Sequence, residues 1–234
     1  MSENSRDEMV LSYTRVRMAL GVLGLMLPVV LIIGGLLEEP GIEPTISDFF
    51  HTTYRDIYVG TLCSIGVFLI SYRGYRREPG EIIDDDWLAT AAGASAFGMA
   101  LLPTASRTGE IATVSQRYLG MSVTPVAHYL CALVFFASLA AFCFIKFART
   151  ARPARRRIYI FSGWVILASL AATSVAAAFK NYIGGEGARI VLEYRLIFWF
   201  EAVGVWAFGL SWLVKSRADL LLLHKAESMA TGKG

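Results

Sequence analysis

The 234-residue chain is poor in charged residues and in cysteine, and both shortages narrow the class of protein it can be. Asp, Glu, Lys and Arg make up 18% of the chain, against about 25% in an ordinary soluble domain. The net charge of +3 is too small to indicate nucleic-acid binding. The three cysteines, Cys63, Cys131 and Cys143, all lie in apolar segments, so no disulfide framework is indicated.

Familiar catalytic signatures are missing as well. The sequence contains no Walker-type phosphate loop, no GxGxxG after a strand, and no CxxC, CxxCH, HExxH or GxSxG. Nucleotide use, covalently attached c-type haem and the common hydrolase motifs therefore have no support.

What the chain does have is a series of long apolar runs, with 55% hydrophobic residues and a mean hydropathy of +0.51. The runs are long enough, or nearly so, to cross a hydrocarbon core about 30 Å thick, and none alternates with period two as barrel strands do. The sequence therefore predicts an all-α, polytopic membrane helix bundle with six transmembrane helices over 17–216, between tails 1–16 and 217–234. The six predicted spans are 18–37, 57–72, 87–106, 121–145, 158–179 and 196–214.

The basic residues predict how these spans are oriented. With six spans, 16 of the 22 Lys and Arg residues fall on the side that holds both termini, and six fall on the other side. Lys and Arg concentrate in cytoplasmic loops, so we expect the N- and C-termini and both tails to be cytoplasmic. We place the protein in a bacterial inner membrane as a multi-pass protein.

Two spans are rich in small residues at helical spacing. Ala89 and Gly93 lie four positions apart in the third span, and Ala168, Ala172 and Ala176 repeat that spacing in the fifth. Small residues four apart allow helix backbones to approach closely in a membrane. We therefore expect the third and fifth spans to be the least exposed to lipid.

Glu201 is the polar residue that most needs a partner. It lies six positions into the last span, where a charged carboxylate costs up to about 3.5 kcal/mol on insertion scales. A structural hydrogen bond to a neighbouring helix and a functional role both account for such a residue. We expect it to point into a polar cavity on the periplasmic side.

The segment before the second span carries several polar side chains. If one helix runs from Thr45 to Tyr72, Ser47, His51 and Arg55 stack on one face of it, with Asp56 in a neighbouring row. Such a ridge indicates either local ion pairs at the membrane surface or part of a binding site.

Together these positions define a candidate ligand site on the periplasmic side of spans two, four and six. Within it, two imidazoles and a carboxylate, from His51, His128 and Glu201, make a plausible zinc set with an open position for water. Zinc is the cofactor that this set would hold, but nothing in the spacing shows that the three converge. The candidate ligand-binding residues are Ser47, His51, Arg55, Asp56, His128, Glu193, Arg195 and Glu201.

Short stretches of the chain carry a family resemblance. The segment PTISDFFHTTYRDIYVGTLCSIGVFLISYRGY, with FGMALLPT and FGLSWLVK, resembles an uncharacterised family of six-span bacterial membrane proteins of unknown function. The Pro-Thr-Ile-Ser-Asp stretch at 44–48, with a His at the head of span four, is distantly similar to the DRAM/Frag-type six-span family, which is associated with GPI-lipid remodelling and autophagy. Ser47-x-x-x-His51 is similar to one element of the CREST membrane hydrolases, although the seventh span and HxxxH pair of that group are absent.

Three classes of function remain open, and whether the protein is an enzyme is not decided by the sequence. The first is an integral membrane protein that binds a lipid or small hydrophobic ligand at the polar pocket. The second is a non-catalytic accessory subunit of a larger membrane complex, with a membrane-protein partner or a second copy of the chain. The third is a metal-dependent membrane hydrolase that acts on lipid. In each class the membrane lipid is a partner and nucleic acid is not.

Overall fold

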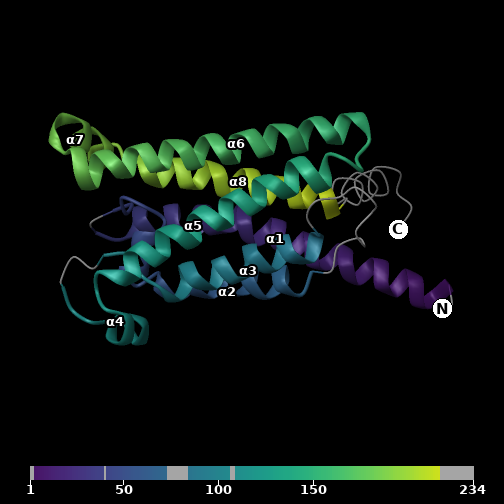
Figure 1. The fold of residues 1–234 in the computed structure, drawn as a ribbon, viewed down its shortest axis with the longest axis horizontal. Helices are drawn as coiled ribbons and strands as arrows, with labels where there is room; N and C mark the ends of the chain where they lie inside the picture. Colours follow the sequence, from purple (N-terminus) through teal and green to yellow (C-terminus); the bar gives the residue numbers. More distant parts are fainter. Residues whose placement is uncertain (1–2, 40, 73–83, 106–108, 217–234) are drawn as a thin grey trace.

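The computed structural model describes residues 3–39, 41–72, 84–105 and 109–216, and these residues form helices without any strand. Six long helices account for most of the structure, and shorter helical segments lie between them (Figure 1). The long helices are α1 (Glu3–Leu37), α2 (Arg55–Ile70), α3 (Asp85–Leu101), α5 (Val123–Ala141), α6 (Pro153–Ala178) and α8 (Leu196–Ser216). The shorter segments are the 3₁₀-helix η1 (Ser47–His51), α4 (Val114–Leu119), the π-helical η2 (Phe142–Phe147) and η3 (Phe179–Ile183), and α7 (Gly185–Glu193).

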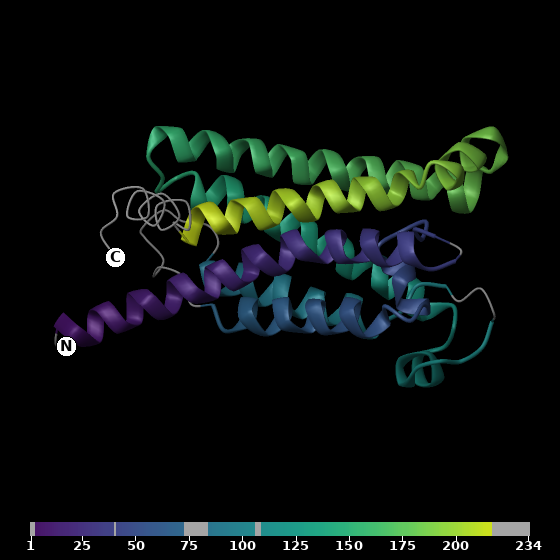
Figure 2. The ribbon, with the colours of Figure 1, turned by 180° about the vertical axis from the view of Figure 1, so that it is seen from behind.

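The long helices form a closed ring in which each contacts the next along the chain, and α8 returns to contact α1. Consecutive helices run in opposite directions, as expected for neighbours joined by short connections (Figure 2). The ring therefore has two distinct ends. We call the end with the start of α1 and the end of α8 the basic end; α4 and α7 lie at the opposite one, the acidic end (Figure 1).

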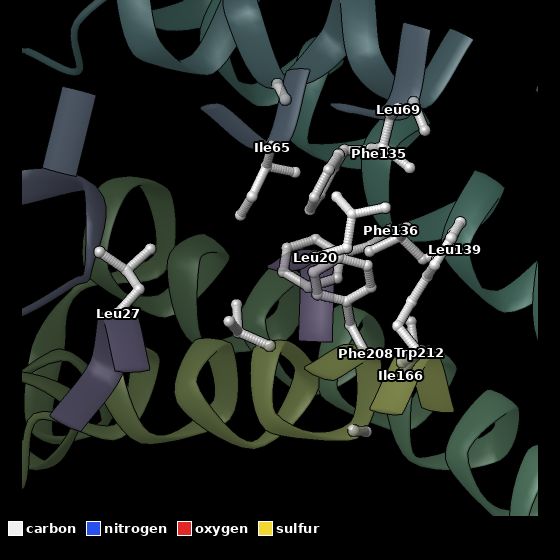
Figure 3. Close-up of a cluster of buried hydrophobic side chains, with 14 of the residues drawn as sticks. Leu20, Leu27, Ile65, Leu69, Phe135, Phe136, Leu139, Ile166, Phe208 and Trp212 are labelled. Carbon is white, nitrogen blue, oxygen red and sulfur yellow. The ribbon is translucent and has the colours of Figure 1, made fainter. Parts of the chain in front are cut away.

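The centre of the ring is filled by large apolar side chains from all of its helices. Figure 3 shows Phe135 and Phe136 of α5 in one cluster with Ile65 of α2 and Phe208 of α8. Trp212 is fully buried near the basic end and contacts several aromatic rings. A continuous apolar core of this kind makes the six helices one packed unit.

Four helical stretches in the described residues are long and apolar enough to cross a membrane: Tyr13–Leu37, Val123–Phe147, Pro153–Ile183 and Leu196–Ser216. This length and composition indicate a membrane protein. The helices α2 and α3 have 16 and 17 residues, somewhat short of the usual spanning length of about 20.

The start of α3 is held by acidic side chains. Asp84 caps the helix by accepting a hydrogen bond from the backbone N–H of Asp86 at 3.3 Å, and negative charge here is favourable because of the helix dipole. Asp85 forms an ion pair with Lys146 of η2 at 2.8 Å, with both side chains nearly inaccessible. This pair ties the start of α3 to the end of α5 at the basic end.

The tight packing predicted for the third span is present in α3. Its small residues face the bundle, and a Cβ at Gly93 would lie only 2.7 Å from the carbonyl oxygen of Gly66 in α2. A Cβ at Gly66 would in turn lie 3.0 Å from the carbonyl oxygen of Gly93. The two backbones thus approach through facing glycines.

The prediction that the fifth span is also among the least exposed helices is wrong. Among the four apolar helices of the described chain, the one that contains α6 is the least buried, with Phe161 and Trp164 exposed. Of its three spaced alanines, Ala168 is exposed, Ala172 is half-buried and Ala176 alone is buried, so the alanine spacing does not mark one continuous interface. The helix packs instead through positions such as Gly163, whose Cβ would meet the ring of Phe144.

A continuous helix from Thr45 to Tyr72 is not formed. The 3₁₀-helix η1 ends at His51, Thr52 is extended, and α2 begins at Arg55. The hydroxyl of Thr52 donates to the carbonyl of Phe49 and accepts from the N–H of Tyr54, which offers the backbone an alternative to helical hydrogen bonds. The predicted ridge is therefore divided between two elements.

Candidate functional site

A cavity of about 390 Å³ lies at the acidic end, between α5, α6 and α8. Its wall is mostly apolar. Polar side chains come from the segment before α2, the residues after α3, the start of α5, α6, η3 and Glu201 of α8. Helices of the fourth and sixth predicted spans line the cavity, together with α6 of the fifth, and α2 does not. Its lining residues include Thr45, Ser47, Thr104, His128, Phe136 and Glu201, with Tyr129, Ala177, Lys180 and Asn181.

His128 and Ser47 form a hydrogen-bonded pair in this wall. The His128 Nε2 and the Ser47 Oγ are 2.9 Å apart, and the His128 Nδ1 lies 2.7 Å from the carbonyl oxygen of Leu102. His128 is 2% exposed, and it is positioned between η1 and the residue that follows α3. Both ring nitrogens therefore have protein partners.

Glu201 fixes the backbone next to Ser47. Its Oε2 accepts a hydrogen bond from the backbone N–H of Ile46 at 2.7 Å. One turn earlier in α8, the N–H of Phe198 donates to the carbonyl of Pro44 at 3.0 Å, which satisfies one of the donors left free at a helix start. The segment from Pro44 to Ser47 is thus docked onto the first two turns of α8.

Asp48 connects this segment to η3 and to the residues that follow α3. Its Oδ2 lies 3.4 Å from the Lys180 Nζ, and its Oδ1 accepts from the Thr104 hydroxyl at 3.1 Å. The Asp48 backbone N–H donates to the Thr45 hydroxyl at 2.9 Å. Lys180 is the cationic side chain in the cavity lining, beside the neutral donor Asn181.

Of the eight candidate ligand-binding residues, Ser47, His128 and Glu201 line the cavity and five do not. His51 is exposed, and its Nε2 lies 3.2 Å from the carbonyl oxygen of Thr104. Arg55 stacks over the ring of Phe50, with its guanidinium carbon 4.2 Å from the ring centre. Asp56 is exposed.

The last two candidates, Glu193 and Arg195, lie around the turn between α7 and α8. Glu193 pairs with Arg189 at 2.6 Å, and Arg189 also pairs with Glu186, whose pKa it lowers. Arg195 has a positive φ of 52° and donates to the carbonyl of Leu192, so it forms the turn into α8.

The zinc set is not assembled. Within the described residues, no group of three or more His, Cys, Asp and Glu side chains could hold a metal ion. The reason lies in the hydrogen bonds: His51 turns to Thr104, His128 is engaged by Ser47 and Leu102, and Glu201 accepts from a backbone N–H. A site of His51, His128 and Glu201 would require all three to leave these partners.

Sequence reasoning missed the contribution of the fifth span. Lys180 and Asn181 of η3, with Ser169, Thr173 and Ser174 of α6, line the cavity. The signal was in the sequence, because Thr173 and Ser174 follow Ser169 by four and five positions and so share one side of a largely apolar helix. Comparison of the chain with protein-family models, with curated proteins and with solved structures gives no significant match.

Proposed function

We propose that this is a six-span membrane protein of the bacterial inner membrane, and that it binds a lipid or small hydrophobic ligand in the cavity at the acidic end. The observation that carries the proposal is the composition of the cavity wall. At about 390 Å³ the cavity is in the usual size range of ligand sites, roughly 300–1,000 Å³. Its apolar wall suits an alkyl chain, and Ser47, His128 and Glu201 suit a polar head group.

The length of the apolar wall supports an elongated ligand. Phe136 lies 13 residues after the first residue of α5, or roughly 20 Å along the helix axis, while His128 is within the first two turns. A ligand with its head at His128 can therefore extend its chain toward the middle of the bundle.

The six-span arrangement is supported by the ring. The helices α2 and α3 are side by side and run along the same axis as the four longer apolar helices (Figures 1 and 2). With 16 and 17 residues they are about 24–26 Å long, slightly less than a typical hydrocarbon core. A short span is accommodated by local thinning of the bilayer at modest cost.

The charge distribution supports an orientation with both termini in the cytoplasm. The basic end carries a cluster of cationic residues around the start of α6, whereas acidic residues outnumber basic ones at the other end. The cavity would then open toward the periplasm. The basic residues around the start of α6 are Arg149, Arg152, Arg155, Arg156 and Arg157.

Binding is tested with protein reconstituted in lipid nanodiscs and radiolabelled glycerol monolaurate as the probe. Wild-type protein should bind the probe saturably. Ala177→Phe places a ring in the cavity and should weaken binding at least about tenfold, equivalent to 1.4 kcal/mol. Ala168→Phe is the matched control, because Ala168 is exposed on the same helix and does not line the cavity.

The control variant should bind like the wild type. Absence of saturable binding to the wild-type protein, or equal binding by Ala177→Phe and wild type, would show that this cavity is not the ligand site.

A further inference from the structure

The hydrogen bonds of His128 determine which of its nitrogens carries the proton. A backbone carbonyl can only accept, so the Nδ1 that lies 2.7 Å from the Leu102 oxygen is the N–H donor. In the neutral ring the Nε2 is then an acceptor, and the hydroxyl 2.9 Å away on Ser47 donates its proton to it. A serine whose proton is shared with a histidine is the arrangement used to activate a hydroxyl as a nucleophile.

The orientation of the imidazole is set by the end of α3. That helix ends at Leu101, so the carbonyl of Leu102 is not used within the helix and is available to the ring. Nucleophilic sites need such a third group, because it holds the base in one tautomer and one position. Here a backbone carbonyl takes the place of the more familiar carboxylate.

Ser47 also differs from other serines in its surroundings. Ser64, Ser174 and Ser211 each donate to a backbone carbonyl three or four residues earlier, as serines in helices commonly do. Ser47 instead begins η1, lines the cavity and bonds a histidine. Its backbone is fixed by the hydrogen bond from Ile46 to Glu201, which makes Glu201 a positioning residue.

We propose that Ser47 and His128 form an acyl-transfer site, and that its substrate is an acyl ester whose alkyl chain occupies the apolar part of the cavity. This inference rests on the proposed function, because it uses the same cavity. Lys180 and Asn181, which line the cavity, supply the positive charge and the amide donor for the negative charge that develops on the ester oxygen.

The reaction has two stages. The Ser47 Oγ forms a bond to the ester carbonyl carbon while its proton passes to the His128 Nε2. The bond from that carbon to the alcohol oxygen then breaks, and the alcohol leaves with the proton from Nε2. In the second stage water gives a proton to Nε2 and its oxygen bonds the acyl carbon; the Ser47 oxygen leaves and regains the proton. The products are an alcohol and a carboxylic acid.

The test uses a fluorophosphonate with a dodecyl chain, which reacts with activated serines by losing fluoride. Wild-type protein in nanodiscs should be labelled on Ser47, as located by peptide mass spectrometry, and not on Ser64 of the same molecule. Ser47→Ala should abolish labelling, and Ser64→Ala should leave it unchanged. His128→Gln should slow labelling by at least about 10²-fold, since general bases contribute roughly 10²–10⁴-fold. A probe with an ethyl chain should label more slowly than the dodecyl probe.

Labelling of wild-type protein elsewhere than at Ser47, or not at all, would overturn the proposal, as would an unchanged rate in a folded His128→Gln variant. Equal rates for the two probes would overturn the assignment of the apolar wall to an alkyl chain. Binding of glycerol monolaurate separates the two proposals. If wild-type protein binds it but is not labelled, the acyl-transfer site is wrong and the binding function stands; if it does neither, both are wrong.

Discussion

At the scale of single residues, several of the polar side chains inside the bundle are explained by their partners. Glu201 accepts from a backbone N–H, Asp85 pairs with Lys146, and His128 bonds both Leu102 and Ser47. Each interaction joins a helix to a segment that is distant in sequence. Polar groups in an apolar environment are costly unless paired, so each of these pairs helps to select one arrangement of the helices.

Two substitutions of Glu201 distinguish the contribution of its hydrogen bond to stability from the contribution of its charge. Glu201→Gln should fold with nearly wild-type stability, because the amide oxygen can still accept from the Ile46 N–H. Glu201→Leu leaves that N–H without its acceptor and should destabilise the protein by about 1–3 kcal/mol. Denaturant unfolding in detergent, followed by tryptophan fluorescence, measures both variants.

If Gln is as destabilising as Leu, the carboxylate charge itself stabilises the fold. Equal stability of both variants and the wild type would mean that the hydrogen bond to Ile46 contributes nothing.

At the scale of helices, the facing glycines of α2 and α3 fix how closely these two helices approach. Gly93→Leu should destabilise the protein by about 1–3 kcal/mol through overpacking, because even a Cβ there would lie 2.7 Å from the Gly66 oxygen. Gly60→Leu is the matched control in α2, since a Cβ at Gly60 has nothing within 4 Å. Thermal unfolding in detergent compares the two.

The control should be neutral or slightly stabilising, because leucine is the better helix former. Equal unfolding temperatures for the two variants would contradict the close contact between α2 and α3.

The sequence predicted where the helices lie better than it predicted which of their faces are buried. The apolar runs located five of the six long helices to within about five residues, whereas α1 begins at Glu3, fifteen residues before the predicted first span. The alanine spacing of α6 did not predict burial, because whether a small-residue face meets a neighbour depends on the place of the helix in the ring. The helix is interrupted at Thr52 because the Thr52 hydroxyl forms hydrogen bonds with the backbone, and hydropathy contains no information about such bonds.

At the scale of the whole molecule, the proposed orientation makes a prediction for the two basic connections. Reporter fusions after Arg77, which lies outside the described residues, and after Arg157 should both report a cytoplasmic location, because basic loops are retained there. A fusion after Glu110 should report the periplasm and serves as the control. A periplasmic signal from either basic connection would contradict six spans with both termini inside.

Only part of the candidate site could be predicted from the sequence, because its residues come from several helices of the ring. Ser47, His128 and Glu201 were identifiable singly, as polar residues near the ends of apolar runs. Their grouping with Lys180 depends on α6 lying between α5 and α8, and no local pattern specifies that order. For the same reason the three residues of the predicted zinc set do not converge, since His51 contacts Thr104 and does not line the cavity.

The position of Ser47, His128 and Glu201 near the acidic end of the bundle has a consequence for how a ligand would move. A lipid with its head at Ser47 and its chain beside Phe136 points the same way as the lipids of one leaflet. It could enter and leave without turning over, whereas a lipid from the opposite leaflet would have to be inverted first. A protein built this way would respond to the composition of a single leaflet and would leave the asymmetry of the bilayer intact.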